Sequence, residues 1–270
     1  MNDAIINASS NYRSSQLKSV LREISSSPDR ENNETVRPIL SIVTIYDDDN
    51  ERNWMESYLM NLPVCETGEI EVILCKTFKG SSDRAFTLQE NTVRNGMKIT
   101  YCATCYDEWS FADVRNAAKT VARGDWILSL DTDEYIVQNQ IGDLLNQISN
   151  ASETIGAVMV TILSHHFEYR DNPISAFRAI RLFRNCANIY WQCRVHETID
   201  FSLLQTGHQV GDSTITVFHE GYDIPQEGLR NKLERNLELL MLDFNRNTTD
   251  KIKHYITEYV KRTVRHLDKL

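Results

Sequence analysis

Three carboxylates follow directly on an apolar run in the stretch GDWILSLDTDEY, residues 124–135. A continuous apolar run of this kind is typical of a central parallel strand, and the ligand site of an open α/β sheet lies beyond the carboxyl ends of its strands. Asp131 and Asp133 are two residues apart, so their side chains share a side if the backbone stays extended. Converging carboxylates are costly without a cation between them, and oxygen ligands suit Mg²⁺ or Mn²⁺, which keep positions open for phosphate oxygens. The triplet therefore indicates a metal and diphosphate site.

Two other interpretations of the triplet remain open. A D-x-D arises by chance, and the chain has a second one, Asp47 to Asp49, after the apolar run ILSIVTIY. Acidic residues after a strand also serve as helix N-caps or as solvated turns. A phosphatase of the haloacid dehalogenase type has a similar apolar strand and D-x-D, but its motif requires Thr or Val where this chain has Tyr135. The phosphatase is therefore the weaker alternative.

The elements that must position the carboxylates alternate along the chain. We predict strands at Ile39–Tyr46, Ile70–Leu74 and Ile99–Ala103, with a helix around Trp54–Leu62 between the first two. Ser110 is the expected N-cap of a further helix, with Asp113 as the acidic half of a capping box, before the strand at Trp126. Strand, helix, strand, helix, strand predicts right-handed crossovers and a mostly parallel sheet covered by helices.

Apolar residues also recur at helical spacing near the C-terminus, over residues 229–244 and again over 252–267, with NRNTTD between them. This pattern predicts two antiparallel helices. We expect this hairpin to pack on the α/β domain or to form a subunit contact, which would make a homo-oligomer. The predicted division is an N-terminal arm and linker at 1–37, marked by the polar stretch SSSPDRENNETVRP, an α/β domain at 38–224 and the helical hairpin at 225–270.

The composition limits the classes of function. The chain has 270 residues, 41% of them hydrophobic, and a formal net charge of -9, which disfavours a broad grip on nucleic acid or anionic membrane. No apolar run is long enough for a transmembrane segment, and the N-terminus lacks the apolar core of a signal peptide, so we expect a cytoplasmic protein. Cys102 and Cys105 form a C-x-x-C that could be half a zinc site or a redox pair, although buried thiols are the commoner outcome.

A longer ordered set of motifs resembles family 2 glycosyltransferases. WSFADVRNAAKTVARGDWILSLDTDEY resembles their donor-site segment, in which an R-N helix leads through a G-D-W turn into a strand ending in D-x-D-E. RPILSIVTIYDDDN is similar to the first strand and nucleotide-binding loop, RLFRN and VHETI to acceptor-side elements, and VFHEGY to a late histidine motif. LRNKLERNLELL resembles the helix that begins the C-terminal extension of one branch. The likeness runs from Arg37 to Leu240 in the expected order.

The resemblance implies a metal-dependent, inverting glycosyltransferase of the GT-A fold, an α/β Rossmann-like, mostly parallel sheet with helices on both faces, followed by the helical hairpin. It implies a nucleoside-diphosphate sugar as the donor, with a UDP-sugar as the favoured one, and Mn²⁺ or Mg²⁺ as the cofactor. The nucleotide-sugar site implied by the resemblance comprises Thr44, Tyr46, Arg115, Asp131 and Asp133, and the implied metal ligands are Asp131, Asp133 and His219. His219 also follows the alternating run ITVF, which predicts that it ends a strand.

Glu197, in VHETI, is the expected catalytic base that takes the proton of the acceptor, with Glu220 and Asp223 as alternatives. A structural alternative is that Glu197 only orients the acceptor or pairs with Arg194 or Arg181. The acceptor itself stays open among a peptide, a glycan, a lipid-linked molecule, a small molecule and a nucleic-acid base.

One departure from the family pattern leaves a second class of function open. The family usually has an acidic residue after the second strand that reads the uracil edge, whereas this chain has Cys75 and Lys76 there. The identity of the nucleotide base is therefore open, and Lys76 could contact a phosphate instead. The alternative function is a non-catalytic module of the same fold that binds a nucleotide, a sugar or a partner protein.

Overall fold

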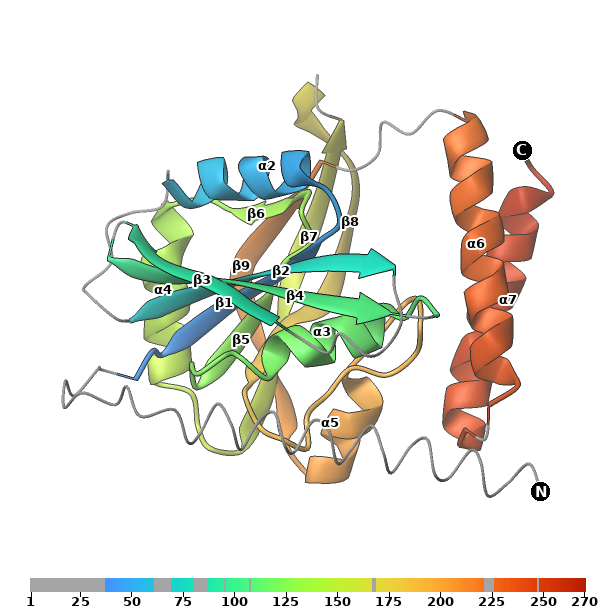
Figure 1. Ribbon diagram of the computed structural model, residues 1–270. Helices are drawn as coiled ribbons and strands as arrows, with labels where there is room; N and C mark the ends of the chain where they lie inside the picture. The colour runs from blue at the N-terminus through green and yellow to red at the C-terminus, as the bar shows by residue number, and fades with distance from the viewer. Residues whose placement is uncertain are drawn as a thin grey trace. The chain divides into compact units, whose positions relative to one another are not determined.

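The computed structural model describes residues 37–60, 69–79, 87–94, 96–106, 108–166, 169–220, 226–246 and 248–270 (Figure 1). The N-terminal arm predicted at 1–37 therefore lies almost entirely outside the described residues, and so does Asp223, one of the alternative bases. No helix in these ranges has the length and the apolar run that crossing a bilayer requires.

One mixed sheet of nine strands, in the order β3-β4-β2-β1-β5-β8-β7-β9-β6, organises the described chain. Its first half contains the predicted strands. The bounds are β1 (Leu40–Tyr46), β2 (Ile70–Lys79), β3 (Thr87–Arg94), β4 (Met97–Tyr106) and β5 (Trp126–Ser129). β1 pairs in parallel with β2 and β5, and β2 pairs in parallel with β4. All seven residues of β1 are buried, as expected of a strand covered on both faces, and the predicted α/β class is confirmed.

The turn into β5 explains why a glycine precedes that strand. The backbone N–H of Gly124 donates to Ser41 Oγ at 2.8 Å and to Glu71 Oε1 at 3.1 Å, and Ser41 Oγ donates to the same carboxylate oxygen. A Cβ atom at position 124 would lie 2.6 Å from the backbone nitrogen of Ser41. Only glycine allows this close approach, which fixes the start of β5 against β1.

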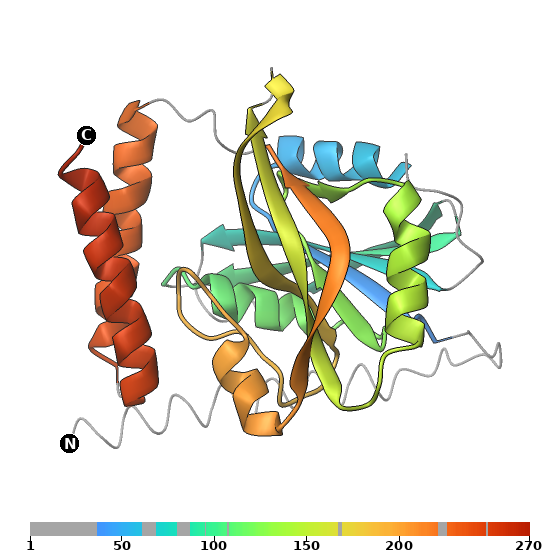
Figure 2. The same ribbon diagram turned by 180° about the vertical axis from the view of Figure 1, so that it is seen from behind.

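The second half of the sheet consists of β6 (Glu134–Ile136), β7 (Ile155–His166), β8 (Tyr169–Arg184) and β9 (Gln209–His219). β8 pairs antiparallel with both β5 and β7, while β7 and β9 are parallel. β6 follows β5 in the chain but lies at the far edge of the sheet, antiparallel to β9. Figure 2 shows β7, β8 and β9 running side by side.

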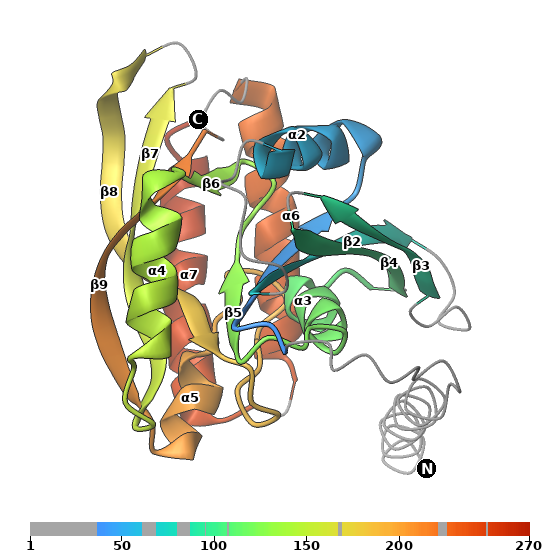
Figure 3. The same ribbon diagram turned by 90° about the vertical axis from the view of Figure 1, so that its left-hand side faces the viewer.

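Helices cover both faces of the sheet (Figure 3). Helices α2 (Asp49–Met60) and α4 (Asn139–Ser149) pack through residues such as Met55 and Leu144 in one hydrophobic core. Helices α3 (Phe111–Lys119) and α5 (Asp200–Thr206) pack through residues such as Val114 and Leu203 in a second core on the other face. The predicted N-cap of α3 is confirmed, because Ser110 Oγ accepts a hydrogen bond from the backbone N–H of Asp113.

The predicted helical hairpin is also present, as α6 (Gln226–Phe244) and α7 (Asp250–Leu267). The two helices run antiparallel beside each other (Figures 1 and 2). Leu239, Leu240, Ile252 and Ile256 form a third hydrophobic core with Val195, which belongs to the segment before α5. The hairpin therefore packs on the α/β domain, as one of the two expectations had it, and a subunit contact stays a prediction.

The C-x-x-C pair lies within β4, where Cys102 is fully buried opposite Cys75 of β2. Cys105 is three residues further along the same strand and is only partly buried. Side chains three apart in a strand point to opposite faces of the sheet, so Cys102 and Cys105 do not face one metal or one another. Among the described residues, no disulfide joins these cysteines.

Candidate active site

A cavity of about 790 Å³ lies beyond the carboxyl ends of β1 and β5. The lining residues come from the end of β1, α2, β2, α3, the end of β5 and the turn after it, β7, β8, the segment that leads into α5, β9, α6 and α7. The predicted site residues found on its wall are Tyr46, Arg115, Asp131, Asp133, Glu197 and His219. The position matches the rule that ligands of α/β sheets bind beyond the strand ends.

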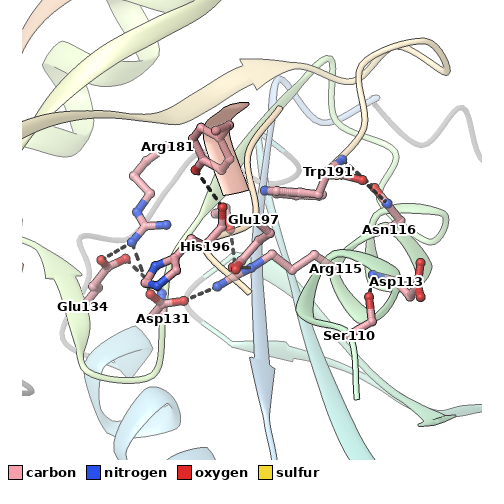
Figure 4. Close-up of polar contacts among 12 residues, drawn as sticks. Ser110, Asp113, Arg115, Asn116, Asp131, Glu134, Arg181, Trp191, His196 and Glu197 are labelled. Carbon is pink, nitrogen blue, oxygen red and sulfur yellow. Dashed lines mark hydrogen bonds and ion pairs between the residues drawn. The ribbon is translucent and has the colours of Figure 1, made fainter. Parts of the chain in front are cut away.

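Arg115 connects the two sides of this cavity (Figure 4). Its side chain is 3% exposed, and Nη2 donates to Asp131 Oδ1 while Nη1 donates to Ser129 Oγ at 2.9 Å. Nε donates to Glu197 Oε1 at 2.7 Å. Glu197 thus pairs with Arg115, and not with Arg194 or Arg181. A single buried guanidinium holds the carboxylate that follows β5 and the carboxylate predicted as the base.

Asp131 accepts from a second arginine as well. Arg181 of β8 donates through Nη2 to Asp131 Oδ2 at 3.2 Å and also to Glu134 Oε1. Both oxygens of Asp131 are therefore bound by guanidinium groups, which compensate its charge. The backbone of residues 131–134 forms a turn, with the N–H of Glu134 donating to the carbonyl of Asp131 at 3.0 Å. The backbone does not stay extended here, and that was the condition for Asp131 and Asp133 to share a side.

These contacts shift the proton affinities of the buried groups. Burial alone would raise the pKa of Asp131, but the charges of Arg115 and Arg181 hold it well below its ordinary value. Burial alone would likewise lower the pKa of Arg115, and the carboxylates of Asp131 and Glu197 more than offset this and raise it. Burial, reinforced by the charge of Asp131, raises the pKa of Glu134. Asp131 and Arg115 are consequently both charged at neutral pH.

Asp133 points to a different partner, His219. The pairing of β6 with β9 places Glu134 opposite His219, and this register brings Nε2 of His219 to 3.2 Å from Oδ2 of Asp133. Nδ1 of the same ring lies 3.3 Å from Ser164 Oγ. Burial opposes protonation of His219, but the hydrogen bond to Asp133 and the neighbouring carboxylates raise its pKa above the ordinary value. His219 ends its strand, as the run ITVF predicted.

The Asp133–His219 pair is suited to a divalent cation that binds together with a phosphate. Within the described ranges there is no group of three or more His, Cys, Asp or Glu side chains arranged to hold an ion. Mg²⁺ and Mn²⁺ do not require such a group, because they bind through one or two protein ligands and complete their shell with phosphate oxygens and water. Asp133 and His219 both line the cavity and supply an oxygen and an imidazole nitrogen. The donor set therefore fits the implied cofactor.

Glu197 lies in a tight loop that is closed by two backbone hydrogen bonds between Gln192 and Thr198, at 2.9 and 3.0 Å. Within this loop, residues 192–198, Cys193 and His196 have positive φ angles of 72° and 53°. The left-handed region costs a residue with a Cβ on the order of 1–2 kcal/mol, so other contacts must hold the loop in this shape.

The C-terminal hairpin supplies those contacts. The backbone N–H of Arg194 donates to Asp243 Oδ2 of α6, and the hydroxyl of Tyr255 of α7 donates to the carbonyl of His196 at 2.8 Å. The ring of His196 stacks on Tyr259, with centroids 4.1 Å apart and planes at 19°. Two helices from the end of the chain thereby fix the loop that carries Glu197.

Arg194 anchors the same loop to the α/β domain. Its side chain is 3% exposed and donates to Glu108 Oε2 at 2.7 Å and to the carbonyl of Trp109 at 3.0 Å. Asn116, which follows Arg115 in α3, exchanges two hydrogen bonds with the backbone of Trp191 at 2.8 and 2.9 Å. The dipeptide R-N of the sequence motif thus has two roles, since Arg115 binds the carboxylates and Asn116 holds the start of the loop.

Several predicted residues lie elsewhere. Thr44 is fully buried in β1 and is not among the cavity-lining residues, because it lies two positions deeper in the strand than Tyr46. Glu220 donates its backbone N–H to the carbonyl of Asp133 but does not line the cavity. Lys76 pairs with Asp49 at 2.9 Å. Asp48 accepts the backbone N–H groups of Asn50 and Glu51, so part of the second D-x-D serves as a helix cap.

Sequence reasoning did not identify the basic and aromatic residues that α6 and α7 add to the cavity. Lys232, Arg235, Tyr255 and Tyr259 are all on its wall, and Trp191 joins them from the loop. LRNKLERNLELL contains both basic residues, so this motif was a signal for them. No local pattern distinguishes the two tyrosines from core residues of an amphipathic helix.

Comparison with known proteins gives the following likenesses. No family model matches the chain. A TPR repeat-containing protein of Synechococcus elongatus is 32% identical over 149 residues, which is 51% of this chain and 36% of the relative, so the match spans about a third of the relative's length.

Among solved structures, residues 1–349 of S. aureus TarS have a TM-score of 0.42 at 12% identity, covering 83% of this chain and 71% of that one. The same part of TarS in complex with UDP has a TM-score of 0.43 at 11% identity, covering 85% and 72%. The mannosyltransferase PcManGT of Pyrobaculum calidifontis, in complex with GDP-Man and Mn²⁺, has a TM-score of 0.45 at 11% identity, covering 90% and 74%. Likenesses at this level assign neither a substrate nor the role of a residue.

Proposed function

We propose that this chain is a metal-dependent glycosyltransferase that moves a sugar from a nucleoside diphosphate to an acceptor. One observation carries the proposal. The predicted donor-side residue Asp131 and the predicted base Glu197, far apart in the sequence, both bind Arg115 at the wall of one cavity. The Asp133–His219 pair, suited to a cation, lines the same cavity. The ordered motifs of a family 2 glycosyltransferase support the same conclusion.

On the donor side, the nucleotide would bind beyond the end of β1, where Tyr46 and Asp47 line the cavity. Asp133 and His219 would hold Mn²⁺ or Mg²⁺ against the diphosphate. The bound cation supplies a Lewis acid that stabilises the negative charge of the departing diphosphate. Arg115 and Arg181 keep Asp131 ionised and fixed in the wall of this half of the cavity.

On the acceptor side, Glu197 would take the proton. The acceptor oxygen forms a bond to the anomeric carbon as the bond from that carbon to the diphosphate oxygen breaks, and the acceptor's proton passes to the Glu197 carboxylate. Attack from the face opposite the diphosphate inverts the anomeric configuration. The ion pair with Arg115 and the closed loop 192–198 would fix the direction of the carboxylate before the acceptor arrives.

A second candidate is a non-catalytic module that binds a nucleotide or a sugar. The observation that favours it is the departure at the end of β2, where Lys76 stands in place of an acidic residue that reads the nucleotide base and pairs with Asp49. Such a module would bind nucleotides without turning over their sugar esters. Turnover therefore separates the two candidates.

The deciding experiment compares the wild type with Glu197→Gln, which keeps the shape of the side chain and removes its basicity. Donor hydrolysis and transfer are followed by release of UDP or GDP from their sugar diphosphates. We expect turnover to fall by roughly a hundredfold or more, the range of general-base loss, with donor affinity unchanged. Loss confined to acceptor affinity would make Glu197 a binding residue instead, since a loss of uniform binding raises KM and leaves kcat alone.

A calorimetric titration tests the cation separately. We expect UDP or GDP to bind at least tenfold more tightly with Mn²⁺ than with EDTA, and Asp133→Asn to remove the difference. Glu56→Gln, a change of the same kind on α2 outside the cavity, is the matched control. If the wild type binds the nucleotide equally tightly with EDTA and with Mn²⁺, the proposed metal dependence is wrong. If it binds nucleotides tightly but turns over no nucleotide sugar, the non-catalytic binding module is the better of the two candidate functions.

A further inference from the structure

A second hollow, of about 710 Å³, lies between α5 and α7, next to the candidate active-site cavity. Phe201 of α5 lines one part of it. Seven residues of α7 line the rest, namely Asp250, Lys251, His254, Tyr255, Glu258, Tyr259 and Arg262. A volume of this size falls within the range of ligand pockets in proteins. None of the residues that held a predicted role in transfer lies in it.

The floor of the second hollow is aromatic. Phe201 and Tyr255 meet edge to face, with ring centroids 5.4 Å apart and planes at 89°. Tyr255 and Tyr259 follow at 4.8 Å and 56°. Three rings tilted against one another form a concave surface, which does not match one flat, extended ring system.

The two hollows are neighbours, because Tyr255 and Tyr259 line both. The stack of His196 on Tyr259 and the bond from the Tyr255 hydroxyl to the His196 carbonyl join this floor to the residue next to Glu197. A ligand that has its reacting end at Glu197 and also occupies the second hollow would cross these two tyrosines.

The polar rim of the second hollow restricts the chemistry of its occupant. Asp250 and Glu258 are acidic and Lys251 and Arg262 are basic, so their formal charges cancel. A rim with no net charge does not favour a polyanion such as a phosphate polymer or a nucleic acid, whose binding depends on an excess of basic side chains. The rim offers both donors and acceptors of hydrogen bonds, and His254 adds a ring nitrogen of either kind.

A neutral saccharide chain matches this combination. Its rings present C–H groups, which face aromatic π systems favourably, and its hydroxyl groups both donate and accept hydrogen bonds. We propose that the second hollow binds the part of a neutral oligosaccharide acceptor that is remote from the reacting hydroxyl, an inference that rests on the proposed glycosyl transfer. The acceptor is then a glycan of several sugar units.

The test measures binding of neutral saccharides to the full chain by titration calorimetry. Maltotetraose, cellotetraose, mannotetraose and chitotetraose are each compared with their monosaccharide. We expect at least one tetrasaccharide to bind ten times more tightly than its monosaccharide, and Phe201→Ala to remove most of this gain. His254→Ala changes an exposed rim residue, and it keeps the test valid if Phe201→Ala folds poorly. We expect it to weaken binding of the same tetrasaccharide about threefold or more. Arg265→Ala, on the same helix outside the hollow, is the control and should bind as the wild type does.

Equal affinity for every tetrasaccharide and its monosaccharide would overturn the proposal. So would a tetrasaccharide gain that Phe201→Ala and His254→Ala both retain, or preferential binding of inorganic tetraphosphate that the same two variants lose. Thermal shift with UDP or GDP and Mn²⁺ tests the proposed transfer separately. Absence of any nucleotide binding would refute the acceptor role, whereas chain-length-dependent binding that is lost in Phe201→Ala would still identify the hollow as a saccharide site.

Discussion

Tyr255→Phe removes a single hydroxyl that holds the loop of Glu197 from the C-terminal hairpin. The ring keeps its packing against Phe201 and Tyr259, and the change removes the 2.8 Å hydrogen bond to the carbonyl of His196. A neutral hydrogen bond contributes about 0.5–1.5 kcal/mol, and a buried carbonyl left without a partner costs about 1–3 kcal/mol. We therefore expect the free energy of unfolding to fall by about 1–2 kcal/mol, which lowers Tm by roughly 2–4 °C for each kcal/mol.

The same change should lower turnover more than donor binding. His196 has a φ of 53°, and a bond to its carbonyl helps to hold this costly conformation. Loss of about 1.4 kcal/mol of that support makes the equilibrium constant for the competent loop tenfold smaller. We expect kcat for donor turnover to fall by twofold to about tenfold, with the donor KM unchanged.

Tyr101→Phe is the matched control, because its hydroxyl donates to Glu56 at 3.0 Å on a part of the sheet away from the cavity. It should lose a similar amount of stability and keep its kcat. Steady-state kinetics and urea denaturation of both variants measure the two effects. An unchanged kcat in Tyr255→Phe, or an equal fall in Tyr101→Phe, would refute the claim that the hairpin positions Glu197.

Three further changes test other parts of the site. Arg115→Met should lower the free energy of unfolding, measured by urea denaturation, by about 3 kcal/mol. This is the lower end for breaking a buried ion pair, because Asp131 is 36% exposed and keeps its contact with Arg181; a loss below 1 kcal/mol would contradict this. Burial, with Lys232 and Arg262 nearby, lowers the pKa of His196 to about 4, so below pH 6.5 the unfolded chain takes up a proton that the folded chain does not. Wild-type stability should therefore fall relative to His196→Asn by on the order of 2–3 kcal/mol between pH 6.5 and 4, and a constant difference across that window would be the contrary result. Lys76→Ala should leave competition among UDP, GDP and ADP unchanged if the pair with Asp49 is structural, whereas a lost preference for one base would reveal a role in base recognition.

The first half of the fold could be predicted from the sequence because its signals are local. The buried run of β1, the apolar run of β5 and the cap of α3 at Ser110 each depend on residues adjacent in the chain. β8 was not predicted, because it is long, carries exposed residues such as Phe177, and pairs with β5 and β7 over long separations. Such pairing depends on the assembled sheet more than on intrinsic strand propensity.

The site was predicted in its residue types and not in its contacts. Arg115 and Glu197 are 82 residues apart, and no local pattern shows that they bind each other. The D-x-D was interpreted on the condition of an extended backbone, whereas the N–H of Asp131 donates to the Glu134 carboxylate and the chain turns. The one signal for this turn was Glu134, the acidic residue directly after the D-x-D, whose carboxylate accepts the Asp131 N–H.

The place of β6 has a consequence for the order of folding during synthesis. Its three residues follow β5 within a few positions, yet the strand that pairs with them is β9, which ends at His219. A nascent chain that has emerged only through β6 contains the parallel strands β1, β2, β4 and β5 but has no partner for β6. Because the chain leaves the ribosome N-terminus first and a domain folds as a unit, the pairing that brings His219 to Asp133 forms only after β9 has emerged. The nascent chain therefore contains the residues of the Asp131–Glu134 turn before it contains β9, which supplies His219 to the cavity wall.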